Sequence, residues 1–152
     1  MKKNKLQIEQ LESRIALFST TRQLPNPPTG WVKAVRLALG MSLKQLATKL
    51  SITKQSVQEI ETREKEGAIT LKSLREAARA LDMELVYGFV PKDGSLDQYI
   101  ENKARSLAET IVFRASNTMK LEDQENTTQR IKKAIEDRTI IIKQDLPKAL
   151  WD

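Results

Sequence analysis

Apolar residues recur at near-helical spacing along most of the chain. Near the N-terminus the apolar set is Leu6, Ile8, Leu11, Ile15 and Phe18. With polar residues between them, this pattern predicts an amphipathic helix over residues 4–20. The segment Leu24-Pro-Asn-Pro-Pro-Thr-Gly30 follows, and prolines end a helix because they lack the amide donor. We therefore expect an N-terminal helical segment at residues 1–24 and a Pro-rich linker at residues 25–30.

The stretch from Trp31 to Asp82 predicts four helices. Their apolar positions are Val32, Val35 and Leu39 in the first, Leu43, Leu46, Ala47 and Leu50 in the second, Val57 and Ile60 in the third, and Leu71, Leu74, Ala77, Ala78 and Leu81 in the fourth. Gly40 separates the first two helices. Ser42, Thr53 and Thr70 precede the other three, where a hydroxyl can accept a hydrogen bond from a free amide of the first turn.

Residues 84–90 have a different pattern. The sequence Glu-Leu-Val-Tyr-Gly-Phe-Val is rich in β-branched and aromatic residues and is closed by Pro91, so it predicts a short β-strand. A strand needs a partner for its amides and carbonyls. The β-branched run 139–142 of the same chain and the same strand of a second copy are both candidates. We expect residues 31–91 to form one domain that includes this strand.

The remaining residues, 92–152, predict a C-terminal helical extension. After the turn Lys92-Asp-Gly94, Ser95 is placed to cap a helix that continues to about Met119. Its apolar residues are Leu96, Ile100, Ala104, Leu107, Ile111 and Val112. A more polar helix is expected over residues 121–137, anchored by Ile131, Ala134 and Ile135. Trp151 is expected to dock against the rest of the chain, because an exposed terminal Trp is costly.

Composition places the chain among globular proteins. Hydrophobic residues make up 39% and charged residues 30% of its 152 residues, with only five Gly and five Pro, which argues against a largely disordered chain. The net charge of +6 is uneven. Residues 1–40 have seven Lys and Arg against two Asp and Glu, whereas residues 91–152 have eleven of each. A polyanionic partner would therefore meet the N-terminal part, although a solvated basic surface explains the charge equally well.

The absence of Cys and His excludes disulfides, zinc fingers and catalysis by Ser-His or Cys-His pairs. We expect no cofactor and no enzymatic activity, since the carboxylates are scattered and no Gly-rich phosphate loop is present. An isolated metal-binding pair of Asp or Glu side chains is not excluded by sequence. No apolar run approaches ~20 residues, so the sequence predicts no membrane association and a cytoplasmic location.

The segment from Ser42 to Arg63 has the spacing of a helix-turn-helix. A small residue is needed where the second helix crosses the third, and Ala47 occupies that position. Ile52 in the turn, with Val57 and Ile60 in the third helix, is expected to close the core behind it. With these residues inward, the polar residues of the third helix must face outward.

The expected outward residues have side chains suited to DNA. Gln pairs bidentately with adenine and Lys donates to guanine, whereas Lys and Thr near helix starts suit backbone phosphates. The alternative is that these are ordinary polar faces, since paired amphipathic helices occur in many helical proteins. The candidate DNA-binding residues are Ser42, Lys44, Lys49, Thr53, Lys54, Gln55, Ser56, Gln58, Glu59 and Arg63.

Residues 31–82 resemble the Cro and lambda-repressor-like helix-turn-helix family, through Leu46-Ala47 in the second helix and Ile60-Glu61 in the third. Stretches along nearly the whole chain are similar to the mobile mystery protein A family. They are Pro27-Pro-Thr-Gly-Trp31, Ala38-Leu-Gly-Met-Ser42, Ile69-Thr-Leu71, Val86-Tyr87, Val90-Pro91, Met119-Lys-Leu-Glu-Asp-Gln124 and Leu150-Trp-Asp152. The resemblance implies a mainly α fold: a lambda-repressor-like helix-turn-helix core with an N-terminal helix, one short β-strand and C-terminal helices.

The resemblance further implies a gene on a mobile element beside a Fic-domain protein, and an antitoxin-like repressor that binds double-stranded DNA as a homodimer. The chain departs from the broader family at Leu43, where a phosphate-binding Gln is common. It also departs in the segment Thr62-Arg-Glu-Lys-Glu-Gly67, which we expect to be a longer, more charged loop. This segment fits the short Ser/Thr-x-x-x-Glu-Gly/Asn string of Fic inhibitors, but so short a string arises readily by chance.

A second hypothesis assigns the main role to residues 95–138. Their helices would bind the Fic-domain partner, with DNA binding subsidiary, because neutral charge suits protein contact better than phosphate contact. These helices would equally well dimerise or cover the core.

Overall fold

The computed structural model describes residues 2–116 and 124–152, and the mainly helical architecture is confirmed. By contact the chain divides into two compact units, residues 21–88 (the central unit) and residues 1–20 with 89–152 (the terminal unit). The central unit contains α2 (Trp31–Ala38), α3 (Leu43–Leu50), α4 (Lys54–Glu66) and α5 (Leu71–Ala80). The terminal unit contains α1 (Lys2–Ser19), α6 (Leu96–Ser116), α7 (Gln124–Asp145) and the 3₁₀ helix η1 (Lys148–Trp151).

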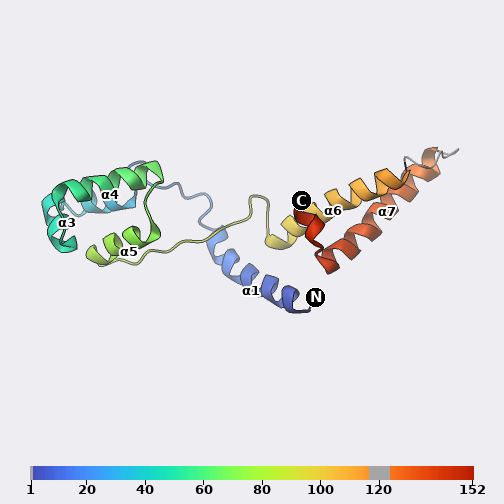
Figure 1. Ribbon diagram of the computed structural model, residues 1–152, viewed down its shortest axis with the longest axis horizontal. Helices are drawn as coiled ribbons and strands as arrows, with labels where there is room; N and C mark the ends of the chain where they lie inside the picture. The colour runs from blue at the N-terminus through green and yellow to red at the C-terminus, as the bar shows by residue number, and fades with distance from the viewer. Residues whose placement is uncertain (1, 117–123) are drawn as a thin grey trace. The chain divides into compact units, whose positions relative to one another are not determined.

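The central unit packs four short helices around one apolar core (Figure 1). Helices α2 and α3 each pack against both α4 and α5. The side chains of Leu46 and Val57 are fully buried at the centre. The other buried apolar residues are Val32, Ala47, Ala77 and Leu81. Helices this short are marginal in isolation, so their stability comes from this shared core.

Hydroxyl caps fix where three of these helices begin. The side chains of Ser42, Thr53 and Thr70 each accept a hydrogen bond from the backbone amide three residues later, at 3.1 Å. At the other end of α4, Gly67 adopts a left-handed conformation with φ of 75°. Glycine takes this conformation without steric cost. All three caps confirm the sequence predictions.

A buried ion pair connects α2 to α4. Arg36 is 6% exposed and Glu61 is 7% exposed. The Arg36 Nε donates to Glu61 Oε1 at 2.6 Å, and Nη2 donates to Oε2 at 3.3 Å. The Arg36 Nη1 also donates to the Met41 carbonyl at 3.0 Å. One guanidinium therefore joins α2, α4 and the turn that leads into α3.

In the terminal unit, α6 and α7 lie side by side and antiparallel (Figure 1), and they share a core with η1. Ala104 and Ala108 of α6 are fully buried, and such small side chains let two helices approach closely. The partners in this core are Ile135, Ile142 and Leu150. Ala134, expected as an anchor, is exposed instead, because the inward face of α7 continues through Thr139 and Ile142.

Polar contacts join the elements of the terminal unit. Lys143 Nζ donates to Glu101 at 2.9 Å and to Asp97 at 3.0 Å. The hydrogen bond to Glu101, and secondarily the one to Asp97, raises the pKa of Lys143 above its ordinary value, although burial opposes this rise. From α1, the Glu12 carboxylate accepts from the backbone amides of Leu96 and Asp97, at 3.0 and 3.1 Å. Glu12 thus caps α6 from another helix.

Ser95 and Trp151 also contribute to this unit. Ser95 accepts from the Gln98 amide at 3.1 Å, as expected of a cap. The indole of Trp151 stacks on Tyr99 with ring centroids 5.8 Å apart, and it stays 51% exposed. The expected docking of the terminal Trp is therefore partial, and the neighbouring Leu150 supplies the buried contact.

Two local expectations are wrong. Residues 84–90 are extended but form no strand with any of the described residues, because the proposed partner 139–142 lies within α7. There, Thr139 and Ile142 are buried as part of a helical face. The segment 62–66 is helical rather than a loop, since Arg, Glu and Lys are good helix formers and the stop comes only at Gly67.

In the part of the chain that the structure describes, no helix is long and apolar enough to cross a membrane.

The buried ion pair gives a testable prediction for stability. Arg36→Met leaves the Glu61 carboxylate buried without its partner, so we expect the free energy of unfolding of the central unit to fall by about 3–5 kcal/mol. Arg36→Met/Glu61→Leu removes both charges and should recover most of this loss. Urea unfolding followed by Trp31 fluorescence, in a Trp151→Phe background, measures the central unit. If the free energy of unfolding falls in the double variant by the sum of the losses in Arg36→Met and in Glu61→Leu, the two charges are not coupled.

Candidate nucleic-acid interface

Helices α3 and α4 are held at close range by one small residue. Ala47 is 4% exposed. The turn between the helices begins at Ser51, which is left-handed with φ of 57°. The Ile52 amide donates back to the Ala47 carbonyl at 3.0 Å. Ile52 itself is 37% exposed, so the expectation that it closes the core is wrong: the turn is tight enough to leave its side chain outside.

The polar residues at the two helix starts are already hydrogen-bonded. Ser42 and Gln45 form a reciprocal capping box, in which the Gln45 side chain accepts from the Ser42 amide at 2.7 Å. Thr53 Oγ1 lies 2.9 Å from Ser56 Oγ. The hydroxyls of Ser42 and Thr53 thus act as the helix caps that the sequence predicts. The Ser56 hydroxyl also has a structural contact, which the sequence did not predict.

The outward face of α4 is polar. The exposed residues Gln55, Gln58, Glu59, Thr62, Arg63 and Glu66 line one shallow groove along this helix. Lys54 is exposed at its first position. Glu59 and Arg63 are one helical turn apart and approach to 3.8 Å. Val57 and Glu61 are buried on the opposite side, so α4 is divided into a core face and a polar face.

The cations of α3 do not share one face. Lys44 and Lys49 are both exposed. They are five residues apart, which at about 100° per residue separates them by roughly 140° around the helix axis. The two lysines therefore cannot both lie on the side of α3 that faces α4. The structure brings Gln55, Gln58, Glu59 and Arg63 together, and places these two lysines on different sides of α3.

Sequence reasoning missed the residue that fixes the start of α2. Gly30 offers no side-chain cap. Instead, the Glu64 carboxylate of α4 accepts from the amides of Trp31 and Val32, each at 2.8 Å. Gly30 has a φ of 86°, and a Cβ there would lie 2.8 Å from Glu64 Cδ, so another residue would be strained and would displace the Glu64 carboxylate. No local pattern signals this contact, because the partners are more than thirty residues apart.

A signal did exist for Arg36 and Glu61. Arg36 is four residues after the buried Val32, and Glu61 is four residues after the buried Val57. Positions four apart share a helix face. A charged residue at an inward position on each of two packed helices indicates a buried pair.

No group of three or more Asp or Glu residues within residues 2–116 and 124–152 is arranged to hold a metal ion.

Comparison with known proteins agrees with this geometry. Residues 32–87 match the family of helix-turn-helix domains. The matched segment covers α2 from its second residue, α3 to α5, and the beginning of the extended segment that follows them. No curated protein and no solved structure matches the chain. The match supports a helix-turn-helix DNA-binding domain at residues 32–87. The match does not show membership of the narrower mobile mystery protein A family, and that membership stays a prediction.

The close packing at Ala47 is testable. Ala47→Leu forces extra volume between α3 and α4, so we expect the free energy of unfolding to fall by about 1–3 kcal/mol. Thr48→Leu adds an apolar side chain at the neighbouring exposed position and should change it by less than about 0.5 kcal/mol. Thermal unfolding of both variants makes the comparison. Equal losses would show that Ala47 is not at a tight crossing.

Proposed function

We propose that this protein is a sequence-specific regulator of transcription that represses its target gene as a homodimer bound to double-stranded DNA. The observation that carries the proposal is the division of α4, whose core face is fixed by Val57 and Glu61 while its polar face stays exposed. A helix of this kind can enter the major groove without unfolding the unit that presents it. The helix-turn-helix match at residues 32–87 supports the same assignment.

We assign base reading to the first half of α4. Gln55 and Gln58 can pair with adenine, and Lys54 can donate to guanine. Glu59 can accept from cytosine, although its approach to Arg63 means that DNA must compete with an internal ion pair. Exposed pairs of this kind contribute little to stability, so the cost of releasing Glu59 or Arg63 is small.

We assign phosphate contacts to the residues at the helix starts and on α3. Lys44 and Lys49 would contact different phosphates, since they point to different sides of α3. Ser42 and Thr53 accept within their caps, and a hydroxyl would contact a DNA phosphate by donating its O–H. In the Thr53–Ser56 pair one of the two hydroxyls already donates to the other, so this pair has one O–H left for a phosphate. The net charge of +6 favours association with a polyanion and predicts affinity that falls as salt rises.

Substitutions on α4 test this function. With an operator selected from a random DNA pool, Lys54→Ala or Gln55→Ala should each weaken specific binding by about 1–3 kcal/mol and leave the fold intact. Lys133→Ala removes the same charge from an exposed position of α7 and should leave specific binding unchanged. Fluorescence anisotropy at fixed salt measures the affinities.

Two outcomes would refute sequence-specific binding by α4. One is equal affinity of the unaltered protein for selected and random DNA. The other is a loss in Lys133→Ala as large as in Lys54→Ala, which would reduce the effect to net charge.

A second candidate function is binding of a Fic-domain protein through the terminal unit, as in an antitoxin. Its support is the resemblance to the mobile mystery protein A family, together with exposed apolar residues on α7. Ile140 is 58% exposed and the adjacent Ile141 48%, and neighbouring exposed apolar side chains mark contact surfaces.

Co-purification with a Fic-domain protein, the partner that the resemblance implies, tests the second candidate. Ile140→Asp/Ile141→Asp should weaken the complex about tenfold or more, because a desolvated apolar contact would then bury two charges. Ala134→Asp is the control, since it places the same charge at another exposed position of α7. Binding that survives the double substitution would exclude this face of α7 as the contact.

A further inference from the structure

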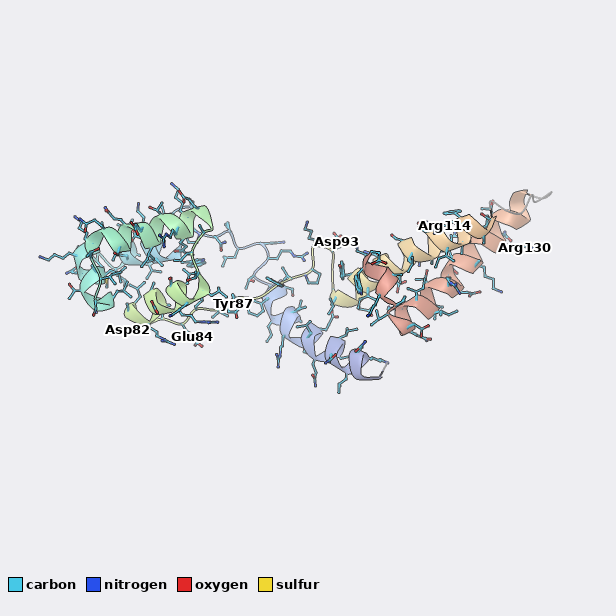
Figure 2. The ribbon with its side chains drawn as sticks, in the orientation of Figure 1. Asp82, Glu84, Tyr87, Asp93, Arg114 and Arg130 are labelled. Carbon is cyan, nitrogen blue, oxygen red and sulfur yellow. The ribbon has the colours of Figure 1, made fainter. Side chains whose placement is uncertain are left out.

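The extended segment after α5 exposes an unusual number of large apolar residues. Val86 is 70% exposed, Tyr87 56% and Phe89 90%. Figure 2 shows Glu84 and Tyr87 along this extended chain. Its backbone forms no β-ladder with any described residue. An extended, apolar and unpaired backbone is a template for pairing with another strand.

The first part of the segment lies along the central unit. Glu84, Leu85 and Val86 line an apolar groove of about 270 Å³ together with residues of α2 and α5. The Tyr87 hydroxyl accepts from Arg75 Nη2 at 3.3 Å, and the Arg75 guanidinium lies 5.6 Å from the Tyr87 ring centroid. Because side chains of a paired strand alternate, pairing would place Leu85 and Tyr87 on one face and Glu84 and Val86 on the other.

We propose that residues 84–92 pair with the same residues of a second copy, as an antiparallel two-stranded ribbon whose two-fold axis passes through Gly88. This proposal rests on the homodimer of the proposed function and names the surface that forms it. In this register Glu84 lies opposite Lys92 of the second copy, the residue with which the bend after the segment begins. Val86 then lies opposite Val90, and Tyr87 opposite Phe89. Each pair joins side chains of matching character, and each occurs twice.

The position of Pro91 agrees with this register. In an antiparallel ladder, every second residue donates and accepts hydrogen bonds with the partner strand, and the residues between do not. Pro91 has no amide hydrogen, so it must take a position that is not hydrogen-bonded. The odd-numbered residues then share that role, and non-hydrogen-bonded pairs bring side chains closest. Tyr87 and Phe89 would consequently meet at the shorter separation.

Neighbouring registers lose these matches. A shift by one residue places the Leu85 and Tyr87 face of one strand beside the Val86 face of the other. A shift by two residues places a charge opposite an apolar side chain, either Glu84 opposite Val90 or Lys92 opposite Val86. The charges and the faces together therefore select the register centred on Gly88.

A single introduced cysteine tests the axis, because the chain has no Cys of its own. In the proposed ribbon the two copies of residue 88 are a hydrogen-bonded pair with Cα atoms about 5.5 Å apart, within the roughly 4.4–6.8 Å that a disulfide spans. Gly88 is not among the glycines with positive φ, so a side chain fits its backbone. Gly88→Cys in the full chain should oxidise to a covalent dimer.

The matched control is Val86→Cys, in the same segment and exposed to solvent. Its two copies would be displaced by four residues along the ribbon, roughly 13 Å, which is too far for a disulfide. A covalent dimer on a non-reducing gel from Gly88→Cys but not from Val86→Cys supports the proposal. Comparable cross-linking of both variants, or none in Gly88→Cys, overturns it.

Charge reversal tests the register in the unmodified dimer. Glu84→Lys places two lysines opposite each other at both ends of the ribbon, so the dissociation constant of the dimer should rise about tenfold. Glu84→Lys/Lys92→Glu restores opposite charges and should return it close to its original value. Sedimentation velocity of the full chain measures both. A monomeric unaltered protein, or a double variant as weak as the single one, refutes this pairing.

The tests of the ribbon and of sequence-specific DNA binding can fail independently. A protein that cross-links at position 88 but does not distinguish selected from random DNA retains the ribbon and refutes the regulator. A protein that distinguishes them while monomeric refutes the ribbon and retains the regulator.

Discussion

The buried ion pair between Arg36 and Glu61 is the contact on which the geometry of the central unit depends. Its two hydrogen bonds and the third from Arg36 to the Met41 carbonyl join α2, α4 and the turn before α3. Buried charges are costly unless every donor and acceptor is satisfied. In the described residues no buried side-chain polar atom lacks a partner. Any tilt of α4 relative to α2 would break these hydrogen bonds, so the pair fixes the angle at which the polar face is presented.

Glu64 adds a second constraint from the same helix. Its carboxylate replaces the missing cap of α2 through the amides of Trp31 and Val32, and a negative charge is favourable at a helix N-terminus. One side of α4 thus anchors α2 twice, through Glu61 and Glu64. The polar side of α4 makes no such contacts with α2. Its side chains can therefore differ without changing the packing of the unit.

Local features could be predicted from the sequence, and contacts between distant residues could not. The caps at Ser42, Thr53 and Thr70, and the small residue at Ala47, each follow from a few neighbouring positions, and the structure confirms them. The run 139–142 has strand-forming composition, yet it is helical because Thr139 and Ile142 complete the face of α7 that packs on α6. Tertiary packing overrides propensity there. The candidate DNA-binding residues are exposed except for the half-buried Ser56, and their contact with DNA stays a prediction.

The strand expected at residues 84–90 failed for a different reason. Its composition is right for a pleated, half-buried surface, but a strand needs a partner strand, and none of the described residues supplies one. A connection that only needed to be flexible would be rich in Gly and Ser. This one has the sequence Leu85-Val-Tyr-Gly-Phe89, with one glycine among four large apolar residues. Leaving these side chains exposed favours aggregation unless something covers them. In the proposed ribbon a second copy would cover them with matching residues and relate two α4 helices by a common axis, so the same short segment would account for both the exposed apolar surface and the symmetry that a paired DNA site requires.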